Sequence, residues 1–196
     1  MKTENKELMR QAREALVGKW GSAVGVTAIY ILIVIALQSI PKTGGLFSII
    51  FTGPLTLGAI IFALAISRKQ DAKVDQLFSG FKRFGTALIA HVLIGVFVLL
   101  WSLLLIVPGI IAGLSYGMTF FILADDDNIS PREAIKMSKK MMYGHKWKYF
   151  KLSLRFAGWF ILSILTLGIG LLWVIPYMWV SLAKFYEDIK NGESVV

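Results

Sequence analysis

The sequence has 196 residues, of which 56% are apolar and 17% are charged, whereas an ordinary soluble domain is roughly 45–50% apolar and about 25% charged. This composition and a mean hydropathy of +0.68 exclude an ordinary soluble globular domain. The absence of cysteine excludes disulfides, thiolate catalysis and cysteine-ligated metals.

The N-terminal segment carries Glu4, Glu7 and Glu14 among its basic residues and runs into a full-length apolar stretch. These features are not those of a cleavable signal peptide. We therefore expect the first apolar helix to remain as a membrane anchor.

Three long segments carry almost no charge: residues 20–67 contain only Lys42, while 84–124 and 156–183 contain no charged residue. Because one helical crossing of a bilayer takes about 20 residues, the first two segments each hold two spans. The third is divided in two because an odd number of spans would place its charged flanks on opposite sides. The sequence predicts an all-α integral membrane protein with six spans arranged as three hairpins. The predicted spans are 20–40, 46–66, 86–107, 109–124, 147–166 and 168–186.

Three turns separate the predicted spans within each hairpin. Their chemistry is that of helix breakers, with Pro and Gly at residues 41–45, Pro108 followed by Gly109, and glycines at residues 167–170. All three turns fall on the same side of the predicted membrane.

Basic residues are distributed asymmetrically around these spans. Twenty of the twenty-one Lys and Arg residues fall on the side of the two termini and the long loops, and only Lys42 lies on the opposite side. Cytoplasmic loops retain Lys and Arg, so both termini are predicted to be cytoplasmic. The same asymmetry accounts for the net charge of +9, and we predict no nucleic-acid partner.

Each cytoplasmic segment contains an amphipathic helical pattern, which is typical of a helix lying at the membrane interface. The clearest pattern begins at Ser130, which with Glu133 forms a capping box and is followed by Pro131 at the first helical position. The apolar positions of the three patterns are Leu8, Ala12, Ala15 and Leu16; Val74, Leu77, Phe78 and Phe81; and Ala134, Ile135, Met137, Met141 and Met142.

A glycine follows each amphipathic pattern, at Gly18, Gly80 and Gly144, with spacings of 62 and 64 residues. This spacing suggests that the single membrane domain, 1–196, consists of three parallel units at 4–67, 71–124 and 131–189. The alternative is that the three units resemble one another only in their hydrophobic pattern.

Ser115 lies in a Gly-x-Ser-x-Gly sequence that resembles a hydrolase nucleophile elbow. An elbow requires a strand before the serine, whereas Ser115 lies in an apolar helical segment. We therefore interpret Gly109, Gly113 and Gly117, like the pair Gly21 and Gly25, as smooth surfaces for helix packing. We expect His91, in the cytoplasmic half of the third span, to hydrogen-bond a neighbouring helix rather than to relay protons.

Lys148, Lys151 and Arg155 form a basic stripe at the start of the fifth span, interleaved with Trp147, Tyr149 and Phe150. Three interpretations stay open: a topology signal alone, contact with anionic lipid headgroups, or pairing of Arg155 with Glu187 or Asp188. Interfacial aromatic residues beside basic residues favour the lipid contact, which makes Lys148, Lys151 and Arg155 the candidate lipid-binding residues.

Two further features have ordinary structural interpretations. Asp125, Asp126 and Asp127 lack the ligand spacing of a calcium loop, so a solvated turn is favoured over a cation site. Pro176 is predicted to kink the sixth span, either for packing or as a hinge.

Several segments resemble a bacterial family of membrane proteins catalogued as domain of unknown function nine hundred and seventy-five. The resemblance extends from about Asn5 to Tyr186, and its most specific part is residues 100–111, with further matches at 77–81, 114–116, 165–173 and 176–177. It implies a multi-pass protein of the bacterial cytoplasmic membrane and carries over no catalytic residues.

Three functions compete on this evidence. The near absence of charge within the spans favours a non-catalytic membrane module that acts through lipids or a membrane partner. The alternative is a small transporter or channel for a lipid, peptide or other solute, which for a chain of this size requires a homo-oligomer. An intramembrane enzyme requires a nucleophile with a base or a metal cluster, and we expect no catalytic residues, cofactor or metal.

Overall fold

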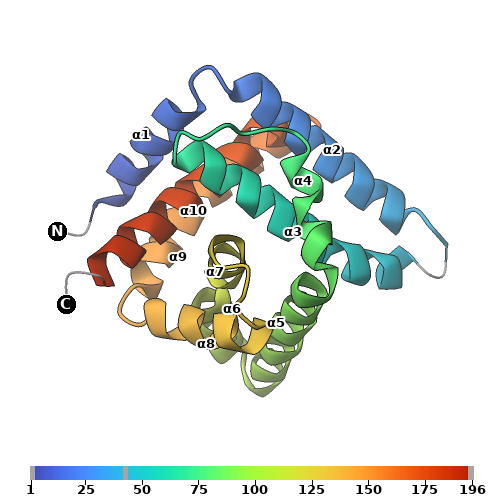
Figure 1. Cartoon of the computed structure of the whole chain (residues 1–196), viewed down its shortest axis with the longest axis vertical. Coiled ribbons are helices and arrows are strands. Elements are labelled where there is room, and N and C mark those ends of the chain that lie inside the picture. The colour runs from blue at the N-terminus through green and yellow to red at the C-terminus, as the bar shows by residue number, and fades with distance from the viewer. Residues whose placement is uncertain (1–2, 42–43, 194–196) are drawn as a thin grey trace.

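The computed structural model describes residues 3–41 and 44–193, and every regular element within them is a helix (Figure 1). In chain order the helices are α1 (Asn5–Leu16), α2 (Trp20–Gln38), α3 (Gly44–Ser67), α4 (Gln76–Ser79), the short 3-10 helix η1 (Gly80–Arg83), α5 (Phe84–Leu104), α6 (Ile106–Tyr116), α7 (Thr119–Asp125), α8 (Pro131–Met141), α9 (Lys146–Leu165) and α10 (Leu171–Glu193).

Four helical stretches of the described chain are long and apolar enough to cross a membrane. They are Trp20–Gln38, Gly44–Ser67, Gln76–Leu104 and Ile106–Asp125, and they coincide with the first four predicted spans. Helices α9 and α10 are not among them. Basic residues occupy the first half of α9, and charged residues occupy the second half of α10, so each has only a short uncharged run.

The second predicted turn is misplaced. The chain reverses at Leu105, whose extended backbone (φ −162°, ψ 148°) separates α5 from α6. The predicted turn residues Pro108 and Gly109 instead lie in the first turn of α6. Proline is well tolerated there because its missing N–H is not needed by the helix. Gly109 packs against Ser102 across the helix pair, so its lack of a side chain serves close approach rather than the reversal.

The fourth predicted span is interrupted in the middle. Helix α6 ends at Tyr116 and α7 begins at Thr119. Ser138 of α8 bridges the break, because its hydroxyl donates to the carbonyl of Ser115 (2.8 Å) and accepts from the N–H of Met118 (3.1 Å). The interhelical serine therefore satisfies backbone groups that the interruption leaves free.

The three segments that precede the long helix pairs pack in a cyclic order. Helix α1 lies along α10, α4 lies on α3, and α8 lies on α7 (Figure 1). Each short helix thus contacts the second arm of the preceding pair, which for α8 is the α7 part of the fourth span, and α1 closes the cycle by contacting the last pair. Leu8, Ala12, Ala15 and Leu16 of α1 are buried in this contact region.

Close backbone packing occurs at glycines outside the predicted packing stripes. A side chain on Gly58 would meet the carbonyl oxygen of Leu77 at 1.8 Å, and one on Gly80 would meet that of Pro54 at 2.0 Å. By contrast, Gly21, Gly25 and Gly113 have no non-neighbouring atom of the described chain within 4 Å of that position. The predicted packing stripes are therefore wrong at those three glycines, although Gly117 does lie against Tyr149.

The three glycines that follow the amphipathic patterns do not share one backbone conformation. Gly18 and Gly144 adopt nearly the same left-handed backbone (φ +77° and +76°). Gly80 is right-handed (φ −62°) and is required instead for contact with α3. The predicted capping box of Ser130 and Glu133 is present at the start of α8.

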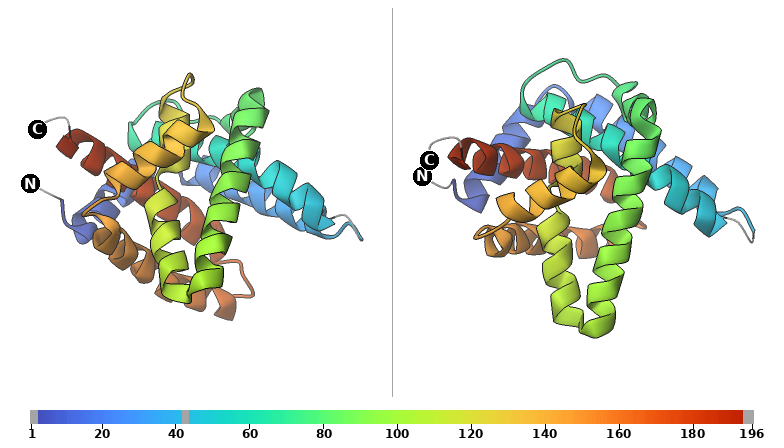
Figure 2. Two further views of the ribbon diagram at one scale, coloured as in Figure 1. Left: turned by 90° about the horizontal axis from the view of Figure 1, so that it is seen from below. Right: turned by 60° about the horizontal axis from the view of Figure 1, so that its bottom comes forward.

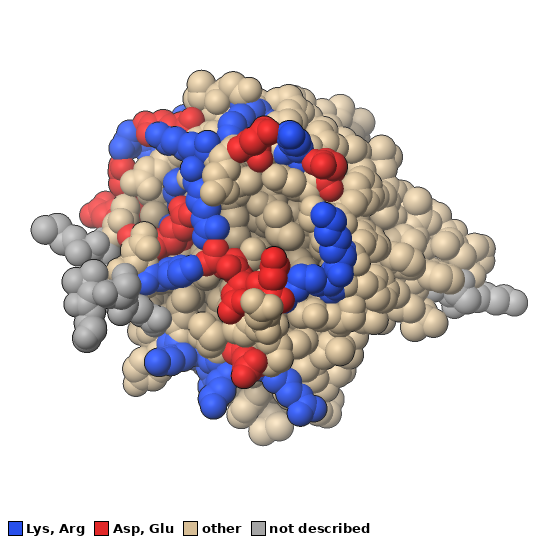
Figure 3. Space-filling view, in the orientation of Figure 1, with Lys and Arg blue, Asp and Glu red and all other residues tan. Residues whose placement is uncertain are grey.

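The helix pairs extend from a common charged base. The α5–α6 pair and the α2–α3 pair project in different directions from this base (Figure 2). Lys, Arg, Asp and Glu gather over the base, whereas the projecting part of α2 and α3 carries none among its described residues (Figure 3). Large apolar side chains are exposed at the far ends of the pairs, including Leu103 (82%), Leu165 (78%) and Leu167 (94%).

Candidate functional site

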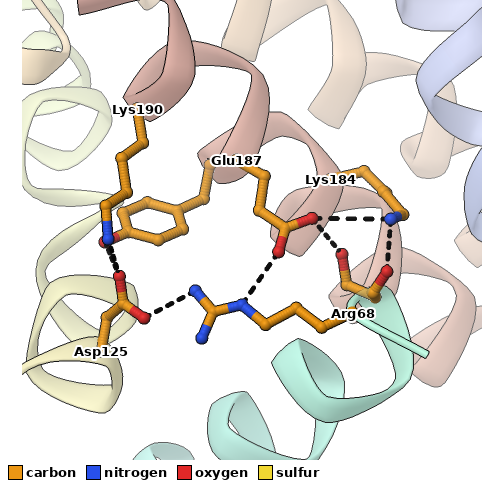
Figure 4. Close-up of polar contacts among 7 residues, drawn as sticks. Arg68, Asp125, Lys184, Glu187 and Lys190 are labelled. Atoms are coloured by element: carbon orange, nitrogen blue, oxygen red, sulfur yellow. Dashed lines mark hydrogen bonds and ion pairs between the residues drawn. The ribbon is translucent and has the colours of Figure 1, made fainter. Parts of the chain in front are cut away.

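An ion-pair cluster joins the ends of three helices in the base (Figure 4). Arg68, just after α3, contacts Asp125 at the end of α7 (2.6 Å) and Glu187 of α10 (3.0 Å). Lys190 also contacts Asp125, and Lys184 contacts Glu187 (3.5 Å). The cluster connects segments more than 50 residues apart, so it fixes how the three helix ends meet.

The cluster combines three cations with two carboxylates and is well satisfied by hydrogen bonds. The hydroxyl of Ser67 donates to Glu187 (2.7 Å), and that of Tyr186 donates to Asp125 (3.0 Å). Partial burial works against the charge of Arg68, but its hydrogen bonds to Asp125 and Glu187 outweigh that effect and raise its pKa. Such a network suits a structural clamp, because each carboxylate is already occupied by cations and hydroxyl donors.

The three consecutive aspartates do not converge on one point. Asp125 belongs to the ion-pair cluster, Asp127 contacts Arg83 (3.0 Å), and a side-chain oxygen of Asp126 accepts the N–H of Asn128 (2.9 Å). Within residues 3–41 and 44–193, no group of three or more Asp, Glu and His side chains is placed to hold a metal ion.

The predicted basic stripe lies on α9, beside α1, and its members have different surroundings. Lys148 is partly buried and contacts Asp188 of α10 (2.6 Å). Lys151 is exposed and lies over the ring of Trp147, 5.3 Å from its centroid. Arg155 is exposed and makes no ion pair with the described part of the chain.

Of the three interpretations left open for the stripe, the pairing of Arg155 with Glu187 or Asp188 is not formed among the described residues. Asp188 instead forms an ion pair with Lys148, which lies two helical turns before Arg155 on α9. It also accepts a hydrogen bond from the hydroxyl of Thr3 (2.5 Å). Burial raises the pKa of Asp188, but the hydrogen bonds from Lys148 and Thr3 outweigh burial and lower it. Asp188 thus anchors the segment before α1 to both α9 and α10.

The three stripe residues line one cavity of about 420 Å³, together with Lys6, Trp147 and Gly144. Sequence spacing alone placed the stripe on one face of a helix. It could not reveal Lys6 as a neighbour, because the contact depends on how α1 packs against the last helix pair. Glu4 also lines the cavity, so α1 and its N-cap add one basic and one acidic residue to the three of the stripe.

The two intramembrane motif residues have local roles. The hydroxyl of Ser115 donates to the carbonyl of Ile111 (2.6 Å) within α6, so the residue lies in a helix rather than in a nucleophile elbow. The ring of His91 packs against that of Phe120, with centroids 6.5 Å apart. The expected hydrogen bond from His91 to a neighbouring helix is not formed among the described residues.

A family profile described as "Protein of unknown function (DUF975)" matches residues 1–112 and, in a second segment, residues 103–193. The chain belongs to this family. The sequence resemblance is thereby confirmed over nearly the whole length of the DUF975 protein. Comparisons with curated proteins and with solved structures each found no match.

Proposed function

We propose that this DUF975 protein is a non-catalytic module of the cytoplasmic membrane, whose three helix pairs enter the bilayer from the cytoplasmic side. Both termini and the charged base lie in the cytoplasm in this arrangement. The α9–α10 pair supplies the fifth and sixth spans, and Lys148, Lys151 and Arg155 contact anionic headgroups.

The exposed apolar tips carry this proposal. Leu103, Leu104 and Ile106 at the tip of the second pair are 82%, 72% and 76% exposed, and Leu165 and Leu167 at the tip of the third are similarly uncovered. Burying apolar surface is worth about 25 cal/mol per Å², so a patch of this kind requires an apolar environment. Lipid acyl chains supply that environment at the end farthest from the charges.

The third helix pair, α9–α10, can cross the bilayer only if the basic side chains of α9 reach the headgroups. Helix α9 has 20 residues, which at 1.5 Å per residue is about 30 Å, the thickness of the hydrocarbon core. It spans only if Lys151 and Arg155 extend back toward the headgroups, as long basic side chains do at membrane interfaces. This geometry brings the two side chains and anionic phosphates together.

The polar groups near the spans favour a non-catalytic role. Ser115 and Ser138 are occupied by helix carbonyls and by a backbone N–H. The charged cluster at the base is internally paired and joins helix ends. In the cluster, Glu187 accepts from the Ser67 hydroxyl but is already neutralised by Arg68 and Lys184. Neither arrangement therefore offers the free base beside a nucleophile that an intramembrane hydrolase requires.

The test uses single-cysteine variants, which the natural absence of cysteine makes clean. A membrane-impermeant maleimide is added from either side of oriented membrane vesicles. We expect Lys73→Cys and Lys140→Cys to react only from the cytoplasmic side, and Leu105→Cys and Ile169→Cys only from the opposite side. Labelling of the variants at 73 and 140 from opposite sides would refute the common orientation, and cytoplasmic labelling at 169 would remove the last two spans.

A further inference from the structure

A groove runs between α1, α9 and α10, next to the cavity that the basic stripe of α9 lines. Its outer part is a cavity of about 460 Å³ lined by four basic residues, Lys6, Arg10, Arg13 and Arg155. Its inner part is a cavity of about 180 Å³ that shares Arg13, Trp159 and Tyr177 with the outer part. The groove therefore has a cationic rim that continues into an aromatic interior.

Three of the four basic residues at the rim lack a carboxylate partner. Arg10 is neutralised by Glu7 (2.5 Å) and by Glu14 on its own helix. Lys6, Arg13 and Arg155 form no ion pair within the described residues. Arg13 instead lies over the ring of Tyr177, 5.9 Å from its centroid. Three uncompensated cations from two helices form a site for an anion with several oxygens, such as a phosphate.

The interior of the groove fits an apolar chain. Trp20, Trp159 and Trp173 line it, with Val174 at its wall. Trp159 and Trp173 are each 48% exposed, so their rings offer surface rather than being covered by the protein. The hydroxyl of Tyr177 donates to the carbonyl of Met9 (3.1 Å), which holds α1 beside α10 at the junction of rim and interior.

A basic residue five positions before the glycine recurs at an equivalent place in the cyclic arrangement. Arg13 and Trp20 lie five residues before and two residues after Gly18, and Lys139 and Lys146 occupy the same positions around Gly144. Lys139 and Lys146 line a cavity of about 190 Å³ together with Tyr116. Two grooves of the structure therefore combine a basic rim with an aromatic wall.

The third equivalent place differs from the other two in charge. Asp75 stands five residues before Gly80 and Lys82 stands two residues after it, so this place carries one acidic and one basic residue. Phe51 of α3 packs there against the rings of Phe81 and Phe84, at centroid distances of 6.1 and 6.2 Å.

We propose that one anionic phospholipid binds in the groove between α1, α9 and α10. Its phosphate lies among Lys6, Arg13 and Arg155, and an acyl chain lies against Trp20, Trp159 and Trp173. A free phosphate would use only the rim, whereas a phospholipid covers both parts of the groove. This inference rests on the proposed function, because it requires the charged base to lie at an anionic leaflet.

The test measures tryptophan fluorescence in phosphatidylcholine nanodiscs that contain a minor fraction of brominated lipid. Brominated phosphatidylglycerol should quench more strongly than the same fraction of brominated phosphatidylcholine. The triple variant Lys6→Gln, Arg13→Gln and Arg155→Gln should lose this preference, by about fivefold for each charge removed. The matched triple variant Arg132→Gln, Lys136→Gln and Lys140→Gln removes the same charge from the exposed face of α8 and should keep it.

A second variant, Trp159→Phe with Trp173→Phe, should lose the part of the extra quenching that these two residues contribute and keep the part from Trp20, while still retaining phosphatidylglycerol in native mass spectrometry. Equal quenching by the two brominated lipids in the natural sequence would overturn the proposal, as would equal losses in both triple variants. Displacement of the lipid by glycerol phosphate alone would assign the rim to a free anion and would also overturn it. Cysteine labelling of the same preparation separates these outcomes from failure of the membrane arrangement.

Discussion

The base and the tips of the helix pairs differ in which contacts cover their residues. In the base, backbones touch at Gly58 and Gly80, and ion pairs join α3, α7 and α10. At the tips, large side chains such as Leu103 and Leu167 are exposed. The base is thus stabilised by the protein itself, whereas the tips depend on their surroundings. Substitutions in the base should therefore change folding stability, and substitutions at the tips should not.

The largest effect on stability is expected from Gly58→Ala. The new methyl group would fall 1.8 Å from the carbonyl oxygen of Leu77, which is backbone and cannot turn aside. Forced separation of α3 and α4 should lower the free energy of unfolding by about 3 kcal/mol. The measurement is thermal unfolding in detergent, followed by tryptophan fluorescence.

Gly25→Ala is the matched control for this change. Its new methyl group meets no non-neighbouring atom of the described chain within 4 Å, and alanine favours a helix by up to about 1 kcal/mol over glycine. The variant should be as stable as the natural sequence or slightly more so. Similar destabilisation by both substitutions would contradict the close packing of α3 with α4.

The next effect is expected from Arg68→Gln. Loss of the guanidinium removes one cation from both Asp125 and Glu187, while Lys190 and Lys184 still neutralise part of the charge. We expect a loss of about 2 kcal/mol, below the range for a fully buried pair because Arg68 is 31% exposed. Lys73→Gln, which breaks the exposed pair with Asp71, should leave the unfolding temperature unchanged.

A smaller effect, dependent on pH, is expected at Asp188. Its pKa is lower in the folded protein than the ordinary value of 3.8. Its stabilising contribution is therefore complete above about pH 3.8 and is lost as the pH falls through the lowered folded value. Asp188→Asn should cost about 1 kcal/mol at neutral pH and should flatten this part of the acid profile.

Asp71→Asn provides the comparison for that profile, because Asp71 pairs with Lys73 in an exposed position (78% and 67% exposed). Unfolding temperatures measured across the acid range should be the same for Asp71→Asn and the natural sequence. If Asp188→Asn retained the full acid dependence, the contacts of Asp188 with Lys148 and Thr3 would not stabilise the fold.

The sequence predicts the parts of this fold that depend on neighbours along the chain. The capping box of Ser130 is one such feature, and the first four long helices are others. The interruption at Gly117 was not predictable, because it depends on Ser138, a residue of another helix that becomes a neighbour only after folding.

The same distinction, between features set by neighbours along the chain and features set by folding, applies to the candidate site. The spacing of Lys148, Lys151 and Arg155 was sufficient to place them on one face of α9. The periodicity of the sequence could not show that Lys148 forms an ion pair with Asp188, or that the packing of α1 places Lys6 beside Arg155. These contacts arise from the closure of α1 onto the last helix pair, which no local pattern encodes.

The smallest effect on stability is expected at the tips, and Leu104→Ser tests it against Leu55→Ser. Leu104 is 72% exposed and Leu55 is fully buried in α3. The two changes remove the same side chain, so the difference between them isolates its environment. In detergent, Leu104→Ser should change the free energy of unfolding by about 0.5 kcal/mol or less. Leu55→Ser should cost several times more, because it leaves a cavity and buries a hydroxyl. If the two variants were equally destabilised, the α5–α6 tip would have to be packed against protein, and a second copy of the chain would then replace lipid as its neighbour.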